Sequence, residues 1–545
     1  MTIAANTTSG DGIEADEFLL HAIVLYDFDI LPDPARWQQA ADWLEEQPGL
    51  VDDNPWALAA AGATTGLEEL LDRAPELLDQ PGGPRNWPPL LWACYARIPG
   101  HPTTDVVHRL LARGADANAF FIANDCYRFT ALTGVFGRGE NGPWRQAEHP
   151  DALVLARALL EAGADPADGQ ATYNRMFTND DDCLELLLQF GLSAEAPNNW
   201  NDQPGDEAND HASSLLHYQF IWALRNHLET RARLLLQHGV DASRAAPLPP
   251  HANLQQQIVD PWKLAITTGQ TRLAEDLLQY GAGTSPLSPL ESLLASCCSG
   301  DTTAVEKIIA EQPDLPAALK QHFPGILHSF AQNTATTHCE RLQGVIDALA
   351  LCTYPVDSAA GGTTALHQAC WHGNQTMVET LIRAGADSTL RDTSHWVPPL
   401  GWALHRGDPQ MVEIMEQQAV DIFTATVRRL DTRLAAMLNK DSSFANITFG
   451  AMRRRSWQLL NPTVLNTTEA GSPQSDSDAA TPPETLPHDW MTPLAMALIN
   501  GLTQQAAIIL PFAEPLTGKA AEQLISQVEA QADAQTLALA HQAVN

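Results

Sequence analysis

The chain has 545 residues, of which 44% are hydrophobic and 18% charged, a balance that is typical of globular rather than disordered proteins. With 31 Lys and Arg against 66 Asp and Glu, its formal net charge is −35, which repels phosphate backbones and argues against general nucleic-acid binding. The same charge favours a basic partner, although it also promotes solubility without any partner.

Neither the N-terminal sequence nor the cysteines point to export or to a membrane. Residues 1–18 contain no basic segment followed by an apolar run, and the longest apolar runs are shorter than the roughly 20 residues that span a bilayer. The eight cysteines are scattered, without metal-ligand spacing, which is typical of buried thiols in a reducing compartment. We expect a soluble cytoplasmic protein that does not contact membranes; secretion by a route without a signal peptide stays open.

The predicted elements are short helices that follow one another in pairs. Apolar residues recur at i, i+3 and i+4 from Phe18 onward, interrupted by Gly- and Pro-containing turns. These patterns divide the chain into six segments: 1–50, N-terminal capping helices; 51–285, helix pairs with an acidic loop at 197–212; 286–360, divergent helix pairs; 361–450, clearer helix pairs; 451–488, a basic cluster and a disordered linker; and 489–545, a last pair and a C-terminal capping helix.

The clearest pair lies between Gly362 and Asp392. Its first helix carries an apolar stripe at Ala365, Leu366, Ala369 and Cys370, and its second at Met377, Val378, Leu381 and Ile382. Thr363-Thr364 can cap the first helix, Gly373-Asn374 forms the turn, and Gly385 ends the second helix. Two helices this short cannot bury their apolar faces against each other alone, so the pattern predicts stacked neighbours.

This stretch resembles the ankyrin repeat, whose signature is T-P-L-H-x-A over about 33 residues. The matching residues are Thr364, Ala365 in place of Pro, Leu366, His367, Ala369 and the later Gly385-Ala386-Asp387, and Gly114 to Asn118 resembles the same repeat ending. The resemblance implies an all-α fold, an irregular ankyrin-like α-solenoid of roughly eleven or twelve helix pairs with loop insertions. A general α-solenoid is the structural alternative. No strands are predicted, because many of the hairpin fingers look shortened or missing.

The sequence contains no arrangement of catalytic residues with a useful spacing. It lacks a Gly-rich phosphate loop, H-E-x-x-H and G-x-S-x-G, so we expect no enzyme activity, no cofactor and no metal. The resemblance implies that His367 makes local hydrogen bonds that tie one repeat to the next, and His217 is interpreted in the same way. Asp180 to Asp182 are interpreted as helix-capping charges rather than a calcium site, because the D-x-D-x-D-G spacing is absent.

The candidate binding residues follow from the resemblance. In ankyrin stacks, the two residues before the turn glycine are the usual contact positions, and here they precede Gly373 and Gly407. A second set comprises Trp92, Trp222 and Trp402, each followed by Ala; packing between helices is the favoured interpretation, and lining of a groove is the alternative. The groove candidates are Tyr95, Trp371, His372, Trp402, His405 and Arg406.

Three hypotheses for function remain. The first is a monomeric, non-enzymatic ankyrin-repeat protein whose concave groove binds, and in a more specific form neutralises, a basic protein partner. The second is a bacterial effector delivered to a host cell. The third is an enzyme with a cryptic catalytic region in 300–360 or 420–545. The basic cluster Arg453 to Arg455, with Arg428-Arg429 upstream, is expected to pair with the chain's own carboxylates; a site for an acidic peptide is the alternative.

Overall fold

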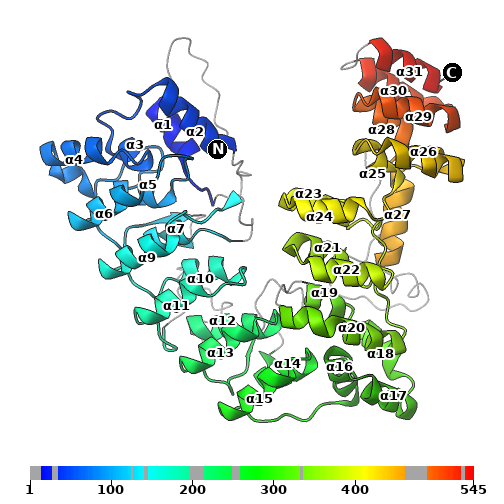
Figure 1. The fold of residues 1–545 in the computed structure, drawn as a ribbon, viewed down its shortest axis with the longest axis horizontal. Coiled ribbons are helices and arrows are strands. Elements are labelled where there is room, and N and C mark those ends of the chain that lie inside the picture. The colour runs from blue at the N-terminus through cyan, green and yellow to red at the C-terminus, as the bar shows by residue number, and fades with distance from the viewer. Residues whose placement is uncertain are drawn as a thin grey trace. The chain divides into compact units, whose positions relative to one another are not determined.

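The computed structural model is mostly helical, as predicted (Figure 1). It describes residues 14–26, 35–123, 127–139, 145–196, 214–247, 258–331, 336–460, 488–529 and 534–544. The acidic loop predicted at 197–212 and the linker predicted after the basic cluster lie outside these residues. The chain divides into two compact units, the first spanning Met1–Ala265 with Gln270–Ser285 and the second spanning Ile266–Gly269 with Pro286–Asn545.

The helices of the first unit stack in two rows. They are α1 (Ala15–Ala22), α2 (Ala35–Glu46), α3 (Pro55–Ala60), α4 (Thr64–Arg73), α5 (Pro89–Tyr95), α6 (Thr104–Ala112), α7 (Ala131–Phe136), α9 (Ala152–Glu161), α10 (Gly169–Met176), α11 (Asp182–Gln189), α12 (Leu215–Arg225), α13 (Glu229–Gln237), α14 (Pro261–Thr267), α15 (Thr271–Gln279) and the 3₁₀ turn η1 (Pro75–Leu78). Contacts run from α3 through α5, α7 and α10 to α12 in one row and from α4 through α6 and α9 to α11 in the other. Each pair therefore buries its apolar stripe against the next pair.

Local sequence signals set where these helices begin. Asn54 accepts hydrogen bonds from the amides of Trp56 and Ala57 at 3.1 and 3.0 Å, and Pro55 occupies the first position of α3. The side chain of Thr130 accepts from the Thr133 amide at 3.2 Å and forms a capping box at the start of α7. Both caps provide hydrogen-bond acceptors for first-turn amides that have no partner inside the helix.

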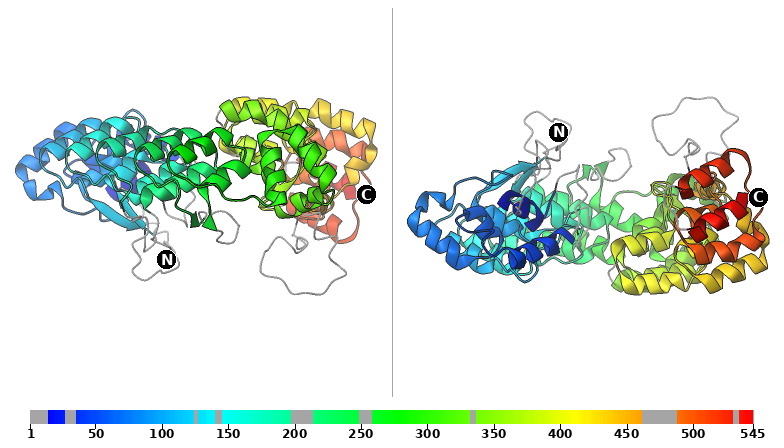
Figure 2. Two further views of the ribbon diagram at one scale, coloured as in Figure 1. Left: turned by 90° about the horizontal axis from the view of Figure 1, so that it is seen from below. Right: turned by 90° about the horizontal axis from the view of Figure 1, so that it is seen from above.

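A β-hairpin, which was not predicted from the sequence, lies before α7. Strands β1 (Phe120–Ala123) and β2 (Tyr127–Thr130) pair antiparallel, cyan in Figure 2. The ring of Phe121 stacks on those of Trp87 and Phe129 at centroid distances of 4.3 and 5.4 Å, whereas Phe120 is 49% exposed. Successive residues of a strand point to opposite faces, so the adjacent Phe120 and Phe121 lie on the exposed and the buried face of this ribbon. Two shorter hairpins follow, β3 (Ala246–Pro247) with β4 (Ile258–Val259) and β5 (Ala359–Ala360) with β6 (Thr363–Thr364).

The second unit contains two hydrophobic clusters. Its elements are α16 (Pro289–Ser299), α17 (Thr302–Glu311), α18 (Leu315–His322), α19 (Ile326–Ala331), α20 (Thr336–Leu351), α21 (Ala365–His372), α22 (Gln375–Arg383), α23 (Pro399–Arg406), α24 (Pro409–Glu416), α25 (Ile422–Val427), α26 (Asp431–Lys440), α27 (Phe449–Leu460), α28 (Pro493–Ile499), α29 (Thr503–Ile509), α30 (Gly518–Glu529), α31 (Ala534–Val544) and the 3₁₀ turns η2 (Ser442–Asn446) and η5 (Leu510–Phe512). One cluster runs from Leu293 to Met415 and the other from Ile422 to Ala543. Among the described residues, no helix combines the length and the apolar character needed to cross a membrane.

The helix α27 runs across the other helices of the second unit (Figure 1). Its Ser456 hydroxyl accepts a hydrogen bond from the Arg391 amide at 3.1 Å, and the buried Arg453 side chain pairs with Asp489 at 2.6 Å. The guanidinium of Arg453 also lies over the ring of Trp396 at 4.2 Å. One helix therefore contacts the segment after α22 and the segment before α28 at the same time.

Candidate functional site

The candidate site begins with the capping box of α21. The backbone amide and hydroxyl of Thr364 lie 3.2 and 2.8 Å from Nδ1 of His367, and Nε2 of His367 lies 3.2 Å from the carbonyl oxygen of Val397. A carbonyl oxygen only accepts, so Nε2 carries the proton and Nδ1 accepts. Burial lowers the pKa of His367 to about 4. The prediction that His367 ties one helix pair to the next is confirmed, because Val397 precedes α23.

The C-terminal ends of α21 and α23 bring four of the predicted residues together. The rings of Trp371 and His405 stack with centroids 5.6 Å apart and planes 20° apart. Nη1 of Arg406 donates to the Trp371 carbonyl oxygen at 2.5 Å, and its guanidinium lies against Gly373, whose φ of 70° suits a glycine. His372 is half-buried, and burial, with the nearby Arg406, lowers its pKa to about 4. The face formed by these residues therefore combines aromatic rings with the guanidinium of Arg406, which is held in place by its hydrogen bond.

Trp402, the fifth candidate, borders the same face but is held by packing. Its ring lies perpendicular to that of Trp371, at 85° and 5.8 Å, and its Nε1 donates to the carboxylate of Asp392 at 3.1 Å. Trp92 is fully buried, and Nε1 of Trp222 donates to the Met176 carbonyl oxygen at 3.1 Å. The recurrent tryptophans therefore fit the favoured interpretation, in which they pack between helices.

Tyr95 was wrongly placed on the binding surface. Its side chain is fully buried and donates from its hydroxyl to the Thr130 carbonyl oxygen at 2.8 Å. The chain after α5 does not form a glycine turn; Ala96 instead forms an antiparallel bridge with Ile23. The segment after α1 thus covers the end of α5, and a partner cannot reach Tyr95 there.

We predict that Gly134→Ala destabilises the first unit, because the ring of Tyr95 occupies the place of a side chain there. A Cβ at Gly134 would lie 2.3 Å from Cε2 of Tyr95. The expected loss is about 1.5 kcal/mol in the free energy of unfolding, measured by urea denaturation. Gly344→Ala is the control, since its Cβ would meet nothing closer than 3.6 Å and alanine favours helix. An unchanged midpoint for Gly134→Ala would contradict the tight packing.

The basic cluster pairs with the chain's own carboxylates, as expected. Arg453 pairs with Asp489 as described above, Arg455 lies 3.4 Å from Asp387, and Arg428 lies 2.5 Å from Glu416. Only Arg454 of the triplet has an exposed side chain without an ion pair among those found in the described residues. The arrangement leaves little free positive charge for an acidic peptide.

The acidic triplet lies at the start of α11, as expected, with Asp181 at the N-cap position and Asp182 in the first turn. Asp180 pairs with Arg175, and Asp181 pairs with Arg231 at 2.5 Å, so these carboxylates bind arginines rather than cap α11 through their side chains. Within the described ranges, no group of three potential metal ligands occurs. The ring nitrogens of His217 are buried without a hydrogen-bond partner in the described part of the chain, so the prediction of local hydrogen bonds is wrong for His217.

Comparison with protein families identifies one stretch of the second unit. The family model of the ankyrin repeat matches residues 361–393, the stretch that contains α21 and α22. The chain therefore contains an ankyrin repeat, and this repeat supplies one side of the face formed by Trp371, His405 and Arg406. No curated protein matches the sequence.

Proposed function

We propose that the chain is a non-enzymatic binding protein, an irregular ankyrin-like solenoid that holds a protein partner. The supporting observation is the α21–α23 surface, which we define as Trp371, His372, Trp402, His405 and Arg406. Trp371 and His372 of this surface lie in the matched ankyrin repeat, a module that generally mediates protein interactions, and its other residues lie on α23, beyond the match. The row-by-row contacts of consecutive helix pairs in the first unit are those of a stacked repeat protein.

The α21–α23 surface is suited to binding because its side chains are already ordered. Trp371 is fixed between His405 and Trp402, and Arg406 is fixed by the Trp371 carbonyl oxygen. Tryptophan and arginine dominate binding energy at many interfaces, and prior ordering reduces the entropy lost on association. A partner that covers the stacked rings would bury apolar area without reorganising the helices.

The proposed partner is basic, and the proposed location is the cytoplasm. The net charge of −35 attracts a positively charged protein and accelerates its approach. The six cysteines whose side chains are described, Cys94, Cys183, Cys297, Cys298, Cys352 and Cys370, are free and buried, which suits a reducing compartment.

We predict that the double substitution Trp371→Ala with His405→Ala weakens partner binding about tenfold or more while the fold is retained. A partner recovered by affinity capture from native lysate is identified by mass spectrometry, and its dissociation constant is then measured for both proteins by titration calorimetry. Tyr280→Ala is the matched control, because Tyr280 is 48% exposed and lies in the first unit. Equal affinity of the double variant and the wild type would refute the proposed surface.

Two further readouts separate the parts of this proposal. The melting temperature of the double variant should stay within about 2 °C of the wild type, since neither side chain is fully buried. Affinity should fall as salt rises from about 50 to about 300 mM, because charge attraction is screened. Affinity that does not change with salt would contradict the proposal that the partner is basic, but it would not contradict the proposed binding surface.

A further inference from the structure

Two buried thiols face each other in the second unit. Cys297 lies in the last turn of α16 and Cys352 directly follows α20; their Sγ atoms are 3.7 Å apart and both side chains are fully buried. A disulfide needs the sulfurs to approach by roughly 1.7 Å more. That movement is small enough for side-chain rotation to supply most of it.

The backbone on both sides holds these thiols in place. A capping box between Ser288 and Glu291 begins α16, and Gly300 ends it in the left-handed conformation. A Cβ at Gly300 would lie 3.0 Å from the carbonyl carbon of Gly344, so the end of α16 lies close against α20. The amides of Cys352 and Tyr354 both donate to the Leu349 carbonyl oxygen at 3.0 Å, which fixes the turn that carries Cys352.

The two thiols are not equivalent. The contact from the Cys297 thiol lowers the pKa of Cys352 and raises that of Cys297, while burial opposes ionisation of both. Nζ of Lys320 donates to Oγ1 of Thr353 at 2.9 Å, which places an ammonium group beside Cys352. Because the thiolate is the nucleophile, Cys352 is the sulfur that reacts first.

The side chain of the neighbouring Cys298 points in a different direction from that of Cys297. Cys298 follows Cys297 in the helix, so its side chain points about 100° around the axis from that of Cys297. Cys298 is buried, and burial raises its pKa to about 12. Within the described side chains, only Cys297 and Cys352 form a thiol–thiol contact.

We propose that Cys297 and Cys352 form an intramolecular disulfide when the protein meets a peroxide. The Cys352 thiolate attacks one oxygen of hydrogen peroxide, the O–O bond breaks, and Cys352 becomes a sulfenic acid while hydroxide takes up a proton as water. The Cys297 sulfur then attacks the Cys352 sulfur, the S–O bond breaks, and the hydroxyl group leaves as a second water with the Cys297 proton. Both thiols are oxidised, the peroxide is reduced, and the protein loses two hydrogens.

The test is disulfide mapping of the full-length protein after treatment with hydrogen peroxide. Free thiols are blocked during denaturation, and non-reduced peptides are analysed by mass spectrometry. Peptides that contain Cys297 also contain Cys298, so Cys297→Ser and Cys298→Ser are compared to assign the sulfur. We expect the cross-link to Cys352 in the wild type and in Cys298→Ser, reduced at least about tenfold in Cys297→Ser, and reversed by dithiothreitol.

A chain oxidised while unfolded in denaturant is the reference for chance pairing. The native protein should give the Cys297–Cys352 peptide in clear excess over that reference, so the wild-type comparison does not require any variant to fold. Equal yields in the native and unfolded chains would overturn the proposal. So would conversion of Cys352 to sulfinic acid without a cross-link, or a cross-link that persists in Cys297→Ser.

Discussion

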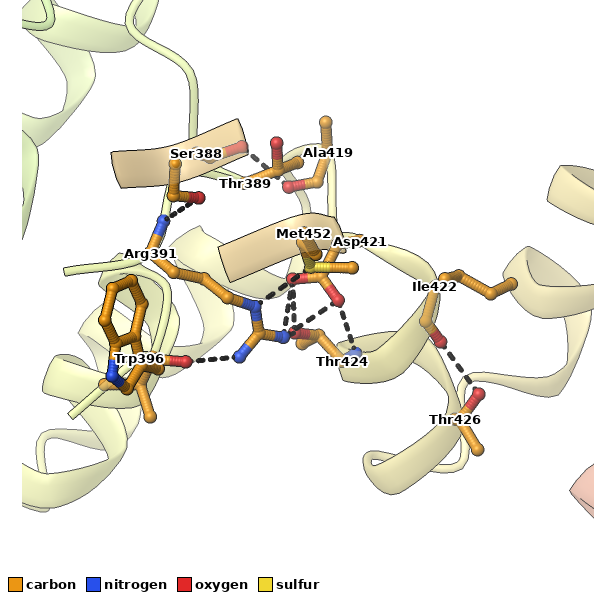
Figure 3. A network of polar contacts seen from close by, with 12 residues as sticks. Ser388, Thr389, Arg391, Trp396, Ala419, Asp421, Ile422, Thr424, Thr426 and Met452 are labelled. Atoms are coloured by element: carbon orange, nitrogen blue, oxygen red, sulfur yellow. Dashed lines mark hydrogen bonds and ion pairs between the residues drawn. The ribbon is translucent and has the colours of Figure 1, made fainter. Parts of the chain in front are cut away.

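Asp421→Ala is expected to lower the free energy of unfolding of the second unit by about 3–5 kcal/mol. Nη2 of Arg391 donates to both carboxylate oxygens of Asp421 at 2.9 and 2.8 Å, and both side chains are less than a tenth exposed (Figure 3). The substitution leaves the guanidinium buried without its carboxylate. It also removes the N-cap of α25, because Asp421 accepts from the Thr424 amide at 2.8 Å.

The measurement is urea denaturation of the full chain, with unfolding monitored by circular dichroism. Arg73→Ala is the matched control, because it breaks an Arg73–Asp53 pair of 2.9 Å whose side chains are 65% and 75% exposed, at a helical position of α4. That loss should stay below about 1 kcal/mol. Adding Arg391→Met to Asp421→Ala should restore part of the stability, since it removes the unpaired charge. Equal losses from Asp421→Ala and Arg73→Ala would contradict the role of burial.

Acidification from pH 7 to pH 5 is expected to destabilise the protein through its buried histidines. Burial lowers the pKa of His149, His217 and His367 to about 4. Between pH 6.5 and 4 the unfolded chain therefore binds more protons than the folded chain, so stability falls as pH falls through this window. Each histidine accounts for about 2 kcal/mol at pH 5. Asp357 opposes the trend, because burial raises its pKa to about 6 and protonation relieves its desolvation.

His217→Leu isolates one of these groups, because the His217 ring has no hydrogen bond in the described part of the chain to lose. The variant should lose about 2 kcal/mol less than the wild type between pH 7 and pH 5, measured by urea denaturation at both pH values. His238→Leu is the control, since it makes the same substitution at an exposed histidine, the residue that directly follows α13. A His217→Leu curve parallel to that of the wild type would show that this site does not titrate as described.

The helices were predictable because their signals are local. The stripe from Ala365 to Cys370 and the Thr364 cap lie within a few turns of chain, and the helix forms where they predict it. The hairpin of β1 and β2 was missed because each strand has only four residues, and β1 begins with two adjacent Phe rather than with an alternating pattern.

The surroundings of single side chains were less predictable, because they depend on residues far away in the sequence. The burial of Tyr95 follows from the bridge between Ala96 and Ile23, more than 70 residues earlier. Motif position placed Trp371 and His405 at the ends of their helices, but the stacking of their rings depends on how α21 packs against α23. Packing between two helices cannot be predicted from the hydrophobic pattern of either helix alone.

The crossing helix α27 limits where the polypeptide can be shortened. Ser456, Met452 and Arg453 all contact the stretch from Arg391 to Trp396, which lies between α22 and α23. A fragment that stopped at the end of α26 would contain every residue of the family match. In that fragment, however, Arg391 and Trp396 would lack their contacts with α27. A fragment that keeps these contacts of the ankyrin repeat's flanking segment must therefore extend at least to Ser456, and to Asp489 if it is also to keep the partner of the buried Arg453.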